Sequence, residues 1–491
     1  MNYEIKTLKK NNTWDIIKKN NNIKELNVLK TKWVYKIKYL SEDNIEFKAR
    51  YVAKGFEQLY GLDYLNTFAS VIKQMAWKLI FALAINKGWY IYKIDMILAF
   101  VQGDIDKNIY IKSPEIYYNE NIILKLNKAL YGLKQSARIW YTTLKSILNK
   151  LNFINIKSDE CIFINKYSGL ILNIFVDDIA IVGSSEVLIK DFIKNLKRYL
   201  DLKDLGPIKD YLGIQINLNK ESIELFQEEY IEKCLTDLNL EKCTPVATPM
   251  IAKNNLKINP NKANLNDIKL AQKIIGKLLY LALGTRWDIA FSVLKLARYT
   301  SNPSKEHLVA MKRIFRYLKG TKNFKTIYKK DYNSFIKGFC DSDYAGDKSS
   351  AKSTSGYIFI YGNGPISWRT KLQSVVAQNT AESELIAINL AAKEAIYLRR
   401  ILVELNQYNQ EKFPIWTDNT AAKAISENAI YHDKSKHIDT KYYYIRDLIN
   451  KGLLDLNWIS TNNQIADGLT KPLDRIKLSR FIDMIQNYNN Y

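Results

Sequence analysis

The stretch Ile174-Phe175-Val176-Asp177-Asp178-Ile179-Ala180-Ile181-Val182-Gly183 decides the fold of this chain. Two adjacent carboxylates are flanked by apolar, largely β-branched residues, from Leu170 to Val176 before them and from Ile179 to Val182 after them. This pattern predicts a tight β-hairpin that carries charge at its tip. A buried Asp pair needs a counter-charge, and a divalent metal ion is the natural one because hard cations prefer carboxylate oxygens. For this pair alone, an ordinary surface turn is the favoured alternative.

A second strand shifts the balance toward a metal site. Tyr92-Lys93-Ile94-Asp95-Met96 ends in another Asp within an apolar run. Two strands that each deliver a carboxylate to one place make a two-metal site for nucleotidyl transfer.

The composition is that of a large globular protein with a polyanionic partner. At 491 residues the chain is too long for one core, and about two to four domains are expected. A hydrophobic content of 47% with 12% aromatics excludes a disordered chain. The net charge of +23 suits nucleic acid, although AT-rich coding DNA also raises the Lys content.

Cysteine, histidine and hydropathy patterns exclude other classes. The four Cys form no CxxC pair and only three His are present, so neither a zinc site nor a disulfide framework is predicted. The first 22 residues lack the apolar core of a signal peptide, and no apolar run approaches the length of a membrane span. We therefore expect a reducing, intracellular location.

Cations gather on two strands near the N-terminus. Trp33 to Tyr39 alternates apolar and basic positions, and the strand from Phe47 to Lys54 turns Lys48, Arg50 and Lys54 to one side. These cations would hold a triphosphate or a template backbone. A solvated strand face is an equal alternative at this point.

Helical spacing marks the segments between the strands. Phe100 follows the Asp95 strand, and spacing alone favours core packing for its ring. A Gly-led basic turn, Gly132 to Arg138, is the type of turn by which backbone approaches a nucleotide. Helices are predicted at 74–87 with Gly88 as C-cap, 137–151, 228–240, within 268–299, at 304–319 and at 380–405. Residues 243–267 lose this periodicity and read as a linker or long surface loop.

The helix at 304–319 carries a cationic face. Lys312, Arg316 and Lys319 lie at helical spacing, away from the apolar stripe. A solvated face is the usual interpretation of such a pattern. With the charge of this chain we favour contact with a nucleic-acid backbone.

The last third holds a second group of carboxylates. Strands are predicted at 335–340, 356–361, 366–368, 413–417 and 453–459, which together with the helices indicate a mixed α/β sheet. Asp341 and Asp418 follow strand ends, and Asp467 opens a helix after the last strand. Metal binding is one interpretation, and a turn or helix N-cap is the other.

Glu382 and Glu384 compete to join this group from the predicted helix 380–405. Because they are two residues apart, they point about 200° away from each other. Glu384 shares the apolar stripe that packs on the sheet, whereas Glu382 is expected to face water with Asn389 and Lys393. We therefore select Glu384 as the metal ligand.

Seven strings resemble the reverse transcriptase of copia-type LTR retrotransposons, in that family's order, from about Leu8 to Leu473. They are KARYVAKGF at 48–56, LYGLKQ at 130–135, FVDD at 175–178, DLGP at 204–207, TPM at 248–250, RYLKGT at 316–321 and ADGLTKPL at 466–473.

This resemblance implies an α/β and α+β multidomain protein. A right-hand polymerase of fingers, palm and thumb would be followed by a connection region and a ribonuclease H-like α/β domain. The implied boundaries are 1–243 for the reverse transcriptase, 244–320 for the linker and helical connection, 321–475 for the ribonuclease H-like domain and 476–491 for a C-terminal tail.

The resemblance also implies roles for polymerase residues. Asp95 and Asp177 would bridge two Mg²⁺, supported by Asp178. Arg50 would contact the incoming triphosphate, with Lys48 as a helper. Phe100 would stack beneath the sugar and reject a 2′-hydroxyl, which reverses the core interpretation, and Tyr131 would contact the nucleotide. Leu212-Gly213 resembles the hairpin that grips the primer.

In the last third the resemblance is to ribonuclease H. Its four metal-holding acidic residues match Asp341, Glu384, Asp418 and Asp467. Many ribonucleases H carry a mobile His shortly before the last Asp, and this chain has Thr461-Asn462-Asn463 there, so product release would differ. His437 fits a copia-type string, and we expect a structural role for it.

The expected function is RNA-directed DNA synthesis with cleavage of the RNA strand of a hybrid. The implied cofactor is Mg²⁺, two ions per site, with Mn²⁺ as an alternative. The implied partners are an RNA template, a DNA primer, an RNA–DNA hybrid, dNTPs and other Pol or Gag products, in the cytoplasm, in a virus-like particle, or in the nucleus. The alternative is an inactive remnant that only binds nucleic acid. With no protease or integrase motif, we expect the polymerase and nuclease part of a longer polyprotein.

Overall fold

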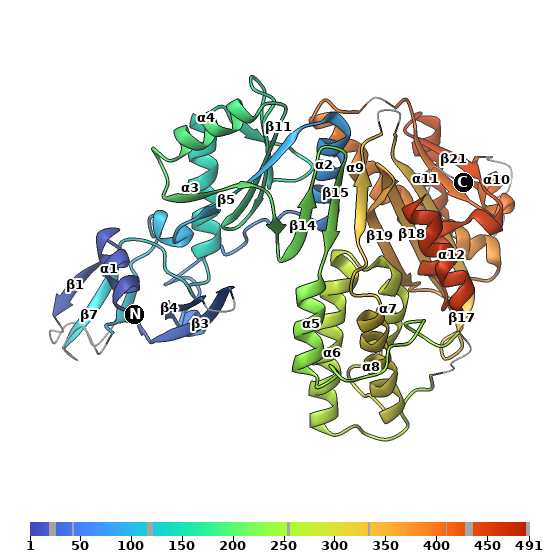
Figure 1. Cartoon of the computed structure of the whole chain (residues 1–491), viewed down its shortest axis with the longest axis horizontal. Coiled ribbons are helices and arrows are strands. Elements are labelled where there is room, and N and C mark those ends of the chain that lie inside the picture. The colour runs from blue at the N-terminus through green and yellow to red at the C-terminus, as the bar shows by residue number, and fades with distance from the viewer. Residues whose placement is uncertain are drawn as a thin grey trace. The chain divides into compact units, whose positions relative to one another are not determined.

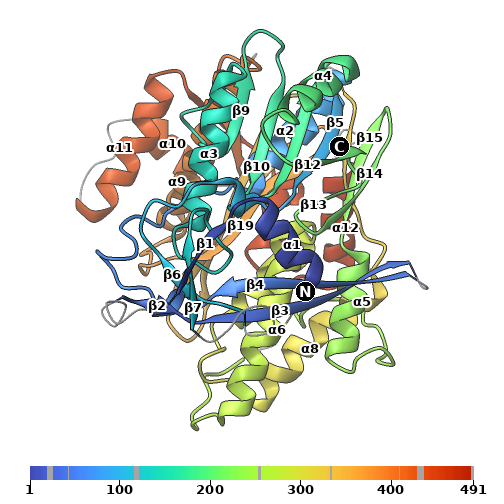
Figure 2. The same ribbon diagram turned by 90° about the vertical axis from the view of Figure 1, so that its left-hand side faces the viewer.

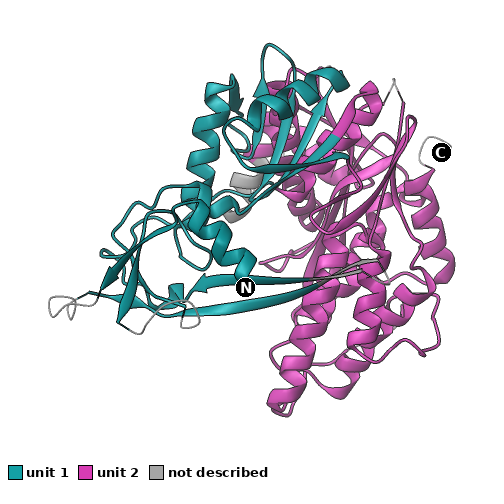
Figure 3. Ribbon diagram, turned by 60° about the vertical axis from the view of Figure 1, so that its left-hand side comes forward, with its two compact units in different colours: residues 1–72, 92–206 teal, residues 73–91, 207–491 magenta. Residues whose placement is uncertain are grey.

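The structure is a computed structural model that describes residues 1–18, 26–41, 44–114, 121–252, 256–331, 334–408, 410–427 and 436–487 (Figure 1). The chain divides into two compact units (Figure 3). Unit 1 comprises residues 1–72 and 92–206, and unit 2 comprises residues 73–91 and 207–491. No helix in the described part of the chain combines the length and the apolar character that a bilayer crossing requires.

A six-stranded sheet forms the larger part of unit 1, and its strand order is β12-β5-β11-β10-β9-β8. Helix α4 contacts β11, and helix α3 contacts β8. The elements are β5 (Tyr90–Met96), α3 (Ser136–Lys150), β8 (Phe153–Asn155), β9 (Ile162–Asn165), β10 (Ile171–Phe175), β11 (Asp178–Gly183), α4 (Glu186–Leu196) and β12 (Leu202–Pro207).

The predicted hairpin is confirmed at the centre of this sheet. Strands β10 and β11 pair antiparallel with Phe175 opposite Asp178, which leaves Val176 and Asp177 as the turn. Val176 takes a left-handed φ of 55°. The indole N–H of Trp140 donates a 2.7 Å hydrogen bond to the Val176 carbonyl. A β-branched residue is disfavoured in this conformation, so the Trp140 contact holds the turn in shape.

The rest of unit 1 is a small sheet of order β1-β7-β6-β2 and a long two-stranded hairpin, β3–β4 (Figure 2). In the hairpin, Lys36 lies opposite Lys48 and Val34 opposite Arg50, so these positions share one face. The elements are α1 (Asn2–Lys10), β1 (Trp14–Lys18), β2 (Val28–Leu29), β3 (Thr31–Ser41), β4 (Asn44–Ala53), a 3₁₀ turn at Gly55–Glu57, another at Ala99–Gln102, β6 (Tyr110–Lys112) and β7 (Ile122–Leu126).

Unit 2 contains two sheets, of order β13-β14-β15-β16 and β19-β18-β17-β20-β21. Strands β17, β18 and β19 are antiparallel neighbours. Strand β20 pairs parallel with β17, and β21 pairs parallel with β20. The strands are β13 (Asp210–Tyr211), β14 (Ile214–Leu218), β15 (Ser222–Phe226), β16 (Thr326–Lys329), β17 (Lys337–Asp347), β18 (Lys352–Tyr361), β19 (Gly364–Leu372), β20 (Phe413–Thr417) and β21 (Leu454–Trp458).

Helices cover both sheets of unit 2. Helix α9 packs against β17, β18 and β20, and α10 and α11 contact the other side of α9. The helices are α2 (Gln74–Lys87), α5 (Glu228–Asp237), α6 (Leu265–Gly284), α7 (Ala290–Ala297), α8 (Lys305–Gly320), α9 (Thr380–Glu404), α10 (Thr420–Glu427), α11 (Lys436–Asn450) and α12 (Arg475–Gln486), with 3₁₀ turns at Trp287–Ile289, Thr461–Asn463 and Ile465–Leu469.

Helix α2 comes from the predicted polymerase region but is built into unit 2. It contacts β15, β16, β18 and β19, and its residues 76 to 86 are all buried. The buried Lys78 ammonium donates to the Leu283 carbonyl at 2.7 Å and lies 3.9 Å from the centre of the Trp368 ring. Asn86 donates to the Tyr361 hydroxyl at 2.9 Å. The compact units therefore do not follow the predicted domain boundaries, which stay a prediction.

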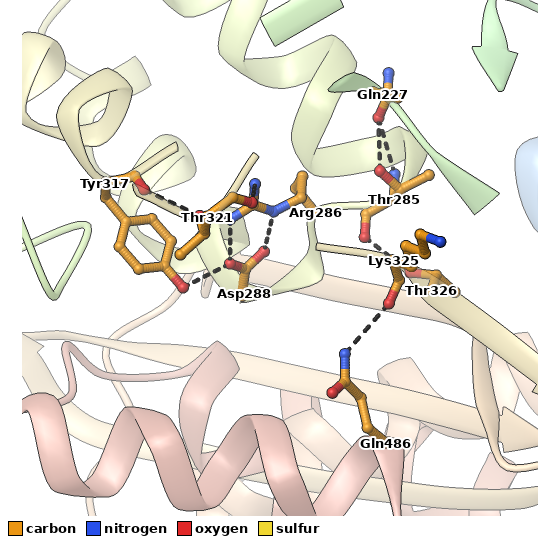
Figure 4. A network of polar contacts seen from close by, with 9 residues as sticks. All are labelled: Gln227, Thr285, Arg286, Asp288, Tyr317, Thr321, Lys325, Thr326 and Gln486. Atoms are coloured by element: carbon orange, nitrogen blue, oxygen red, sulfur yellow. Dashed lines mark hydrogen bonds and ion pairs between the residues drawn. The ribbon is translucent and has the colours of Figure 1, made fainter. Parts of the chain in front are cut away.

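A buried polar network joins the helices of unit 2, and neighbouring hydrogen bonds reach β16 through Thr326 and α12 through Gln486 (Figure 4). Arg286 makes a two-pronged ion pair with Asp288 at 2.9 and 2.7 Å, and its guanidinium also donates to the Thr321 carbonyl and hydroxyl. Tyr317 donates to the same Asp288 carboxylate at 2.8 Å. Because a buried charge is stable only when paired and hydrogen-bonded, this network fixes α6, α7 and α8 relative to one another.

The helix predictions are confirmed with small changes. Gly88 ends α2 in the left-handed conformation, with φ 67°. Ser304 caps α8, completed by His307 in a capping box. The predicted 268–299 helix is interrupted at Thr285–Arg286, where the buried network begins. The predicted loop 243–267 is held against the helices in part, because Arg313 donates to the Thr248 hydroxyl.

One strand boundary was wrong. Strand β17 was predicted to end before Asp341, and it continues to Asp347 with an irregularity after Asp343. Polar residues ended the predicted strand, but here they lie opposite Gly356, Ser355 and Thr354 of β18, which are compatible with a strand interior. Asp341 is therefore a strand residue with its carboxylate at the sheet surface.

Candidate active sites

The first carboxylate site lies in unit 1, where β5 and β11 are adjacent in the sheet. Asp95 is the penultimate residue of β5, Asp177 lies in the turn before β11, and Asp178 is the first residue of β11. The Met96 amide donates to the Asp177 carbonyl at 3.1 Å, so the backbones of the two segments are hydrogen-bonded next to Asp95 and Asp177. Burial raises the pKa of Asp95, and the charges of Asp177 and Asp178 raise it further. Carboxylates that repel one another in this way form a set of oxygen donors that fits a divalent cation, because the cation would offset their negative charge.

A lysine from β5 stands within this site. The Lys93 ammonium lies 3.1 Å from the Asp178 carboxylate, and the two side chains are 8% and 29% exposed. Asp178 is thus paired by the protein itself. The sequence interpretation did not use Lys93, although its two-residue spacing from Asp95 placed both side chains on one strand face.

Three residues predicted to contact a nucleotide lie together. The Arg50 guanidinium is 4.4 Å from the centre of the Tyr131 ring, and the Phe100 ring packs on Tyr131 at 4.7 Å. Burial raises the pKa of Tyr131 to about 12, Arg50 works against that rise, and Asp177 and Asp95 add to it. These influences place Tyr131 in the field of the carboxylates.

Phe100 is not a core residue. It is partly exposed on the 3₁₀ turn Ala99–Gln102, whereas its neighbours Ala99 and Val101 are buried. The core packing that spacing alone favoured is therefore wrong. Lys48 lies opposite Lys36 on the hairpin and also influences the pKa of Asp95.

The basic turn at Gly132 makes a close backbone contact with the end of β4. A Cβ on Gly132 would lie 2.1 Å from the Ala53 carbonyl oxygen, and its φ is 95°. The Tyr131 carbonyl accepts from the Ala53 amide at 2.9 Å. Glycine is therefore required here by the contact with β4, and the approach of this backbone to a nucleotide stays a prediction.

The Leu212-Gly213 turn joins β13 to β14 in unit 2. Both residues are left-handed, with φ of 52° and 76°. The Tyr280 hydroxyl donates to the Leu212 carbonyl at 2.9 Å and would lie 2.4 Å from a Cβ on Gly213. Only glycine fits the second position, and Tyr280 holds this tight hairpin in place.

Two of the three cationic side chains predicted to bind nucleic acid from α8 form hydrogen bonds within the protein. Arg316 donates to the Thr244 carbonyl at 2.8 Å, and Lys319 donates to the carbonyls of Glu241 and Cys243. These bonds favour a structural role for Arg316 and Lys319, which hold the segment before the loop. The binding role of Lys312 stays a prediction.

The second carboxylate site lies in unit 2 on the β17–β20 pair and α9. One carboxylate oxygen from each of Asp341, Glu384 and Asp418 lies within 4.8 Å of the others, and in the described residues this is the group that meets such a metal-binding geometry. The Glu384 carboxylate accepts from the Ser342 amide at 3.2 Å. The Thr461 hydroxyl donates to Asp418 at 2.9 Å.

Burial and mutual repulsion dominate the electrostatics of this second site. Burial raises the pKa of Asp341 to about 7, and the Asp467 carboxylate adds to the rise. Burial likewise raises the pKa of Glu384 well above its usual range, with contributions from Asp341 and Asp418. Oxygens Glu384 Oε2 and Asp467 Oδ1 are buried and have no hydrogen-bond partner among the described residues. Orphaned acceptors in an acidic group fit a bound divalent cation.

Asp467 stands beside the triad with its own cation. It lies in the 3₁₀ turn Ile465–Leu469, and Lys471 pairs with it at 2.9 Å. Burial opposes the charge of Lys471, but the ion pair outweighs burial, so its pKa is raised. The neighbouring Thr470 hydroxyl donates to Asp341. Neither Thr470 nor Lys471 was predicted: the partner of Thr470 lies 129 residues away in the sequence, whereas Lys471 pairs with Asp467 only four residues before it.

The prediction for Glu382 was wrong in one respect. Glu382 and Asn389 were expected to face water, but both are buried, because α10 and α11 cover that side of α9. Glu382 accepts from the Gln378 amide at 2.7 Å and closes the first turn of the helix. Glu384 is the glutamate that reaches the triad. The side chain of His437 lies outside the described residues.

Comparisons with known proteins identify the family of this chain. Residues 11–252 match the model of the family described as reverse transcriptase (RNA-dependent DNA polymerase). The retrovirus-related Pol polyprotein from transposon TNT 1-94 of Nicotiana tabacum is 36% identical over 505 residues, covering 100% of this chain and 38% of that protein. The Pol polyprotein from transposon RE1 of Arabidopsis thaliana is 34% identical, covering 99% of this chain and 33% of that protein. The chain thus spans about a third of the length of these relatives.

Solved structures support the fold. A foamy viral protease-reverse transcriptase in complex with RNA/DNA hybrid matches 93% of this chain and 52% of its own, with a TM-score of 0.51 and 13% identity. A second, in complex with double-stranded DNA, matches 94% of this chain and 69% of its own, with a TM-score of 0.50 and 12% identity. The predicted mixed α/β multidomain fold is confirmed. Together with the motifs, these matches establish that the chain belongs to the copia-type retrotransposon Pol family, in the part that carries the reverse transcriptase.

Proposed function

We propose that this chain copies RNA into DNA at the unit 1 site and cleaves the RNA strand of the resulting hybrid at the unit 2 site. The observation that carries the proposal is the meeting of Asp95 and Asp177 on adjacent strands of a chain from the reverse transcriptase family. The substrates are an RNA template, a DNA primer and dNTPs for synthesis, and an RNA–DNA hybrid for cleavage. The solved relatives bound to RNA/DNA hybrid and double-stranded DNA support nucleic acid as the partner.

At the polymerase site, Asp95 and Asp177 hold divalent cations, with Mg²⁺ the expected ion and Mn²⁺ the alternative. Two such ions, when bound, activate the primer 3′-hydroxyl and neutralise the departing pyrophosphate. Arg50 binds the triphosphate by charge-assisted hydrogen bonds, with Lys48 beside it. Phe100 and Tyr131 form the surface beneath the sugar, where a 2′-hydroxyl would meet the Phe100 ring. The Leu212-Gly213 hairpin contacts the primer, and Lys312 contacts the backbone of the nucleic acid.

At the nuclease site, Asp341, Glu384, Asp418 and Asp467 hold the cations that activate water. Glu384 and Asp467 each have a buried carboxylate oxygen with no hydrogen-bond partner among the described residues, and these oxygens are available to bind a cation. Thr470 orients the Asp341 carboxylate by donating to it. The segment 461–463, in place of a mobile histidine, holds Asp418 through the Thr461 hydroxyl, so Thr461 orients this ligand.

Primer extension tests the proposal directly. The intact chain, with poly(rA)/oligo(dT), dTTP and Mg²⁺, is expected to extend the primer, and Asp177→Asn is expected to abolish extension. Cleavage of a labelled RNA–DNA hybrid should persist in Asp177→Asn. A wild type that binds hybrid tightly but neither extends nor cleaves would contradict the proposal and support the alternative, a remnant that only binds nucleic acid. Fractionation with other Pol and Gag products would test the proposed virus-like particle location.

A further inference from the structure

Lys93 is a buried lysine of strand β5 that lies beside the polymerase carboxylates. It is buried, with its side chain 8% exposed, and its ammonium is 3.1 Å from Asp178. Strand alternation places Lys93 on the same face of β5 as Asp95, while Ile94 between them is fully buried on the other face. Burial destabilises a charged ammonium, and the ion pair with Asp178 offsets this cost for Lys93.

The Lys93–Asp178 ion pair distinguishes Asp178 from the other two carboxylates, Asp95 and Asp177. Asp95 and Asp177 meet where β5 and β11 join, and the positive charge of Lys93 also lowers the pKa of Asp95. Asp178 spends one carboxylate oxygen on the ammonium. Three clustered carboxylates would repel one another strongly without a cation of the protein's own.

We propose that Lys93 is a positioning residue: it holds Asp178 out of the metal-binding set and offsets one negative charge there. This inference deepens the proposed polymerase function and concerns the same site. Asp95 and Asp177 are then the metal-holding carboxylates. Lys93 sets the net charge that a divalent cation meets, which keeps binding weak enough for the ions to exchange.

Removal of the Lys93 charge is predicted to strengthen metal binding at the polymerase site. Most substitutions in an active site would instead weaken metal binding. In Lys93→Met, the Asp178 carboxylate loses this ion pair and the site gains one net negative charge. Loss of one unit charge at this range should lower the half-saturating metal concentration by about tenfold or more.

Site-resolved metal binding provides the test, with Fe²⁺ as the probe in place of Mg²⁺. Iron held by carboxylates, with ascorbate, cuts the nearby backbone, so fragments ending near residues 95 and 177 report the polymerase site. Fragments ending near 341, 384 and 418 report the nuclease site in the same sample and should not change. The full chain is used, and circular dichroism checks folding.

Four variants and one control complete the design. Lys93→Met should shift the polymerase fragments to lower iron concentration, Lys93→Arg should keep the wild-type value, and Asp178→Asn should shift them to higher iron concentration by about tenfold, because the site loses one negative charge. The double variant Lys93→Met with Asp178→Asn should return close to wild type, because both charges are removed. Lys128→Met, which removes the cation of a surface pair with Asp104, is the matched control. If Lys93→Met does not fold, Lys93→Gln replaces it.

Three outcomes would overturn the inference: unchanged or weaker iron cutting in Lys93→Met, no return in the double variant, or loss of cutting in Asp178→Asn as large as in Asp177→Asn. These results do not depend on primer extension. A wild type without extension but with the predicted order of iron binding would contradict the proposed function and leave the role of Lys93 standing.

Discussion

The two carboxylate sites use the same ligands but solve the problem of clustered charge in different ways. In unit 1 the carboxylates are partly exposed, and a buried lysine pairs with one of them. In unit 2, Asp341 and Glu384 are buried, Lys471 forms an ion pair with Asp467, and two buried carboxylate oxygens have no hydrogen-bond partner among the described residues. The polymerase site thus contains a buried lysine paired with one of its carboxylates, whereas the buried carboxylates of the nuclease site, whose pKa values are raised, fit a bound cation.

The largest expected effect is a loss of hybrid cleavage with primer extension retained. Glu384→Gln should reduce hybrid cleavage by about 10³-fold, because it removes a ligand that touches the bound cations. Primer extension should change by less than about twofold, since the metal-holding carboxylates of the polymerase site lie in unit 1. Rates on labelled hybrid and on primed template provide the measurement.

Glu382→Gln is the matched control for that variant. Its carboxylate closes the first turn of α9 and lies outside the triad, so hybrid cleavage should remain near wild type after correction for folded protein. Equal loss of cleavage in both glutamate variants would show that the triad has been assigned to the wrong residue.

The next effect tests the difference in burial. Asp341 has a raised pKa, so the folded protein keeps a proton that the unfolded chain releases, and stability without metal falls as pH rises from about 4 to about 7. Asp341→Asn removes this penalty. In EDTA at pH 8 the variant should be more stable than wild type by about 2 kcal/mol, with no gain at pH 4. Urea unfolding at both pH values measures the difference.

Asp177→Asn provides the comparison for that experiment. Asp177 is partly exposed, so its replacement should change stability in EDTA by less than about 0.5 kcal/mol. A gain as large as that of Asp341→Asn would remove the proposed contrast between the two sites.

A smaller effect concerns nucleotide binding alone. Arg50→Met should raise the KM for dNTP by about tenfold, because charge-assisted hydrogen bonds to a triphosphate contribute about 1.5–3 kcal/mol. Hybrid cleavage should not change. Lys36→Met removes a cation from the same hairpin face without touching Tyr131, and a KM change as large as for Arg50 would mean that the face binds by general charge only.

The smallest effect separates the cations of α8. Lys312→Ala should weaken hybrid binding a few-fold and reduce the salt slope by about 1, as expected for one lost phosphate contact. Lys319→Ala should instead lower the melting temperature with little change in the salt slope, because Lys319 holds the carbonyls of Glu241 and Cys243. Titrations at several salt concentrations distinguish the two.

The parts of this structure that depend on local patterns could be predicted from the sequence. The hairpin at Asp177, the Gly88 cap and the Ser304 cap follow from residue type and spacing within a few positions. The choice of Glu384 over Glu382 also followed from helical periodicity, and its carboxylate is the one that reaches Asp341 and Asp418.

Features that depend on distant partners could not be predicted in this way. Glu382 is buried by two later helices, and Gly132 is required by the close approach of β4. Lys93 resembles an ordinary surface lysine until the strand that carries Asp178 is placed beside it. Strand β17 continues through Asp341, Ser342 and Asp343 because β18 pairs with these residues along its length.

Helix α2 has a consequence for how the protein is made. Its buried Lys78 bonds to Leu283, 205 residues downstream, and Asn86 bonds to Tyr361, 275 residues downstream. At ordinary rates of translation, an apolar helix would leave the ribosome about 15 to 55 s before its last partner exists. During this interval part of the apolar helix lacks the surfaces that later bury it, and a fragment ending before residue 361 would lack the Tyr361 contact and the whole of β19.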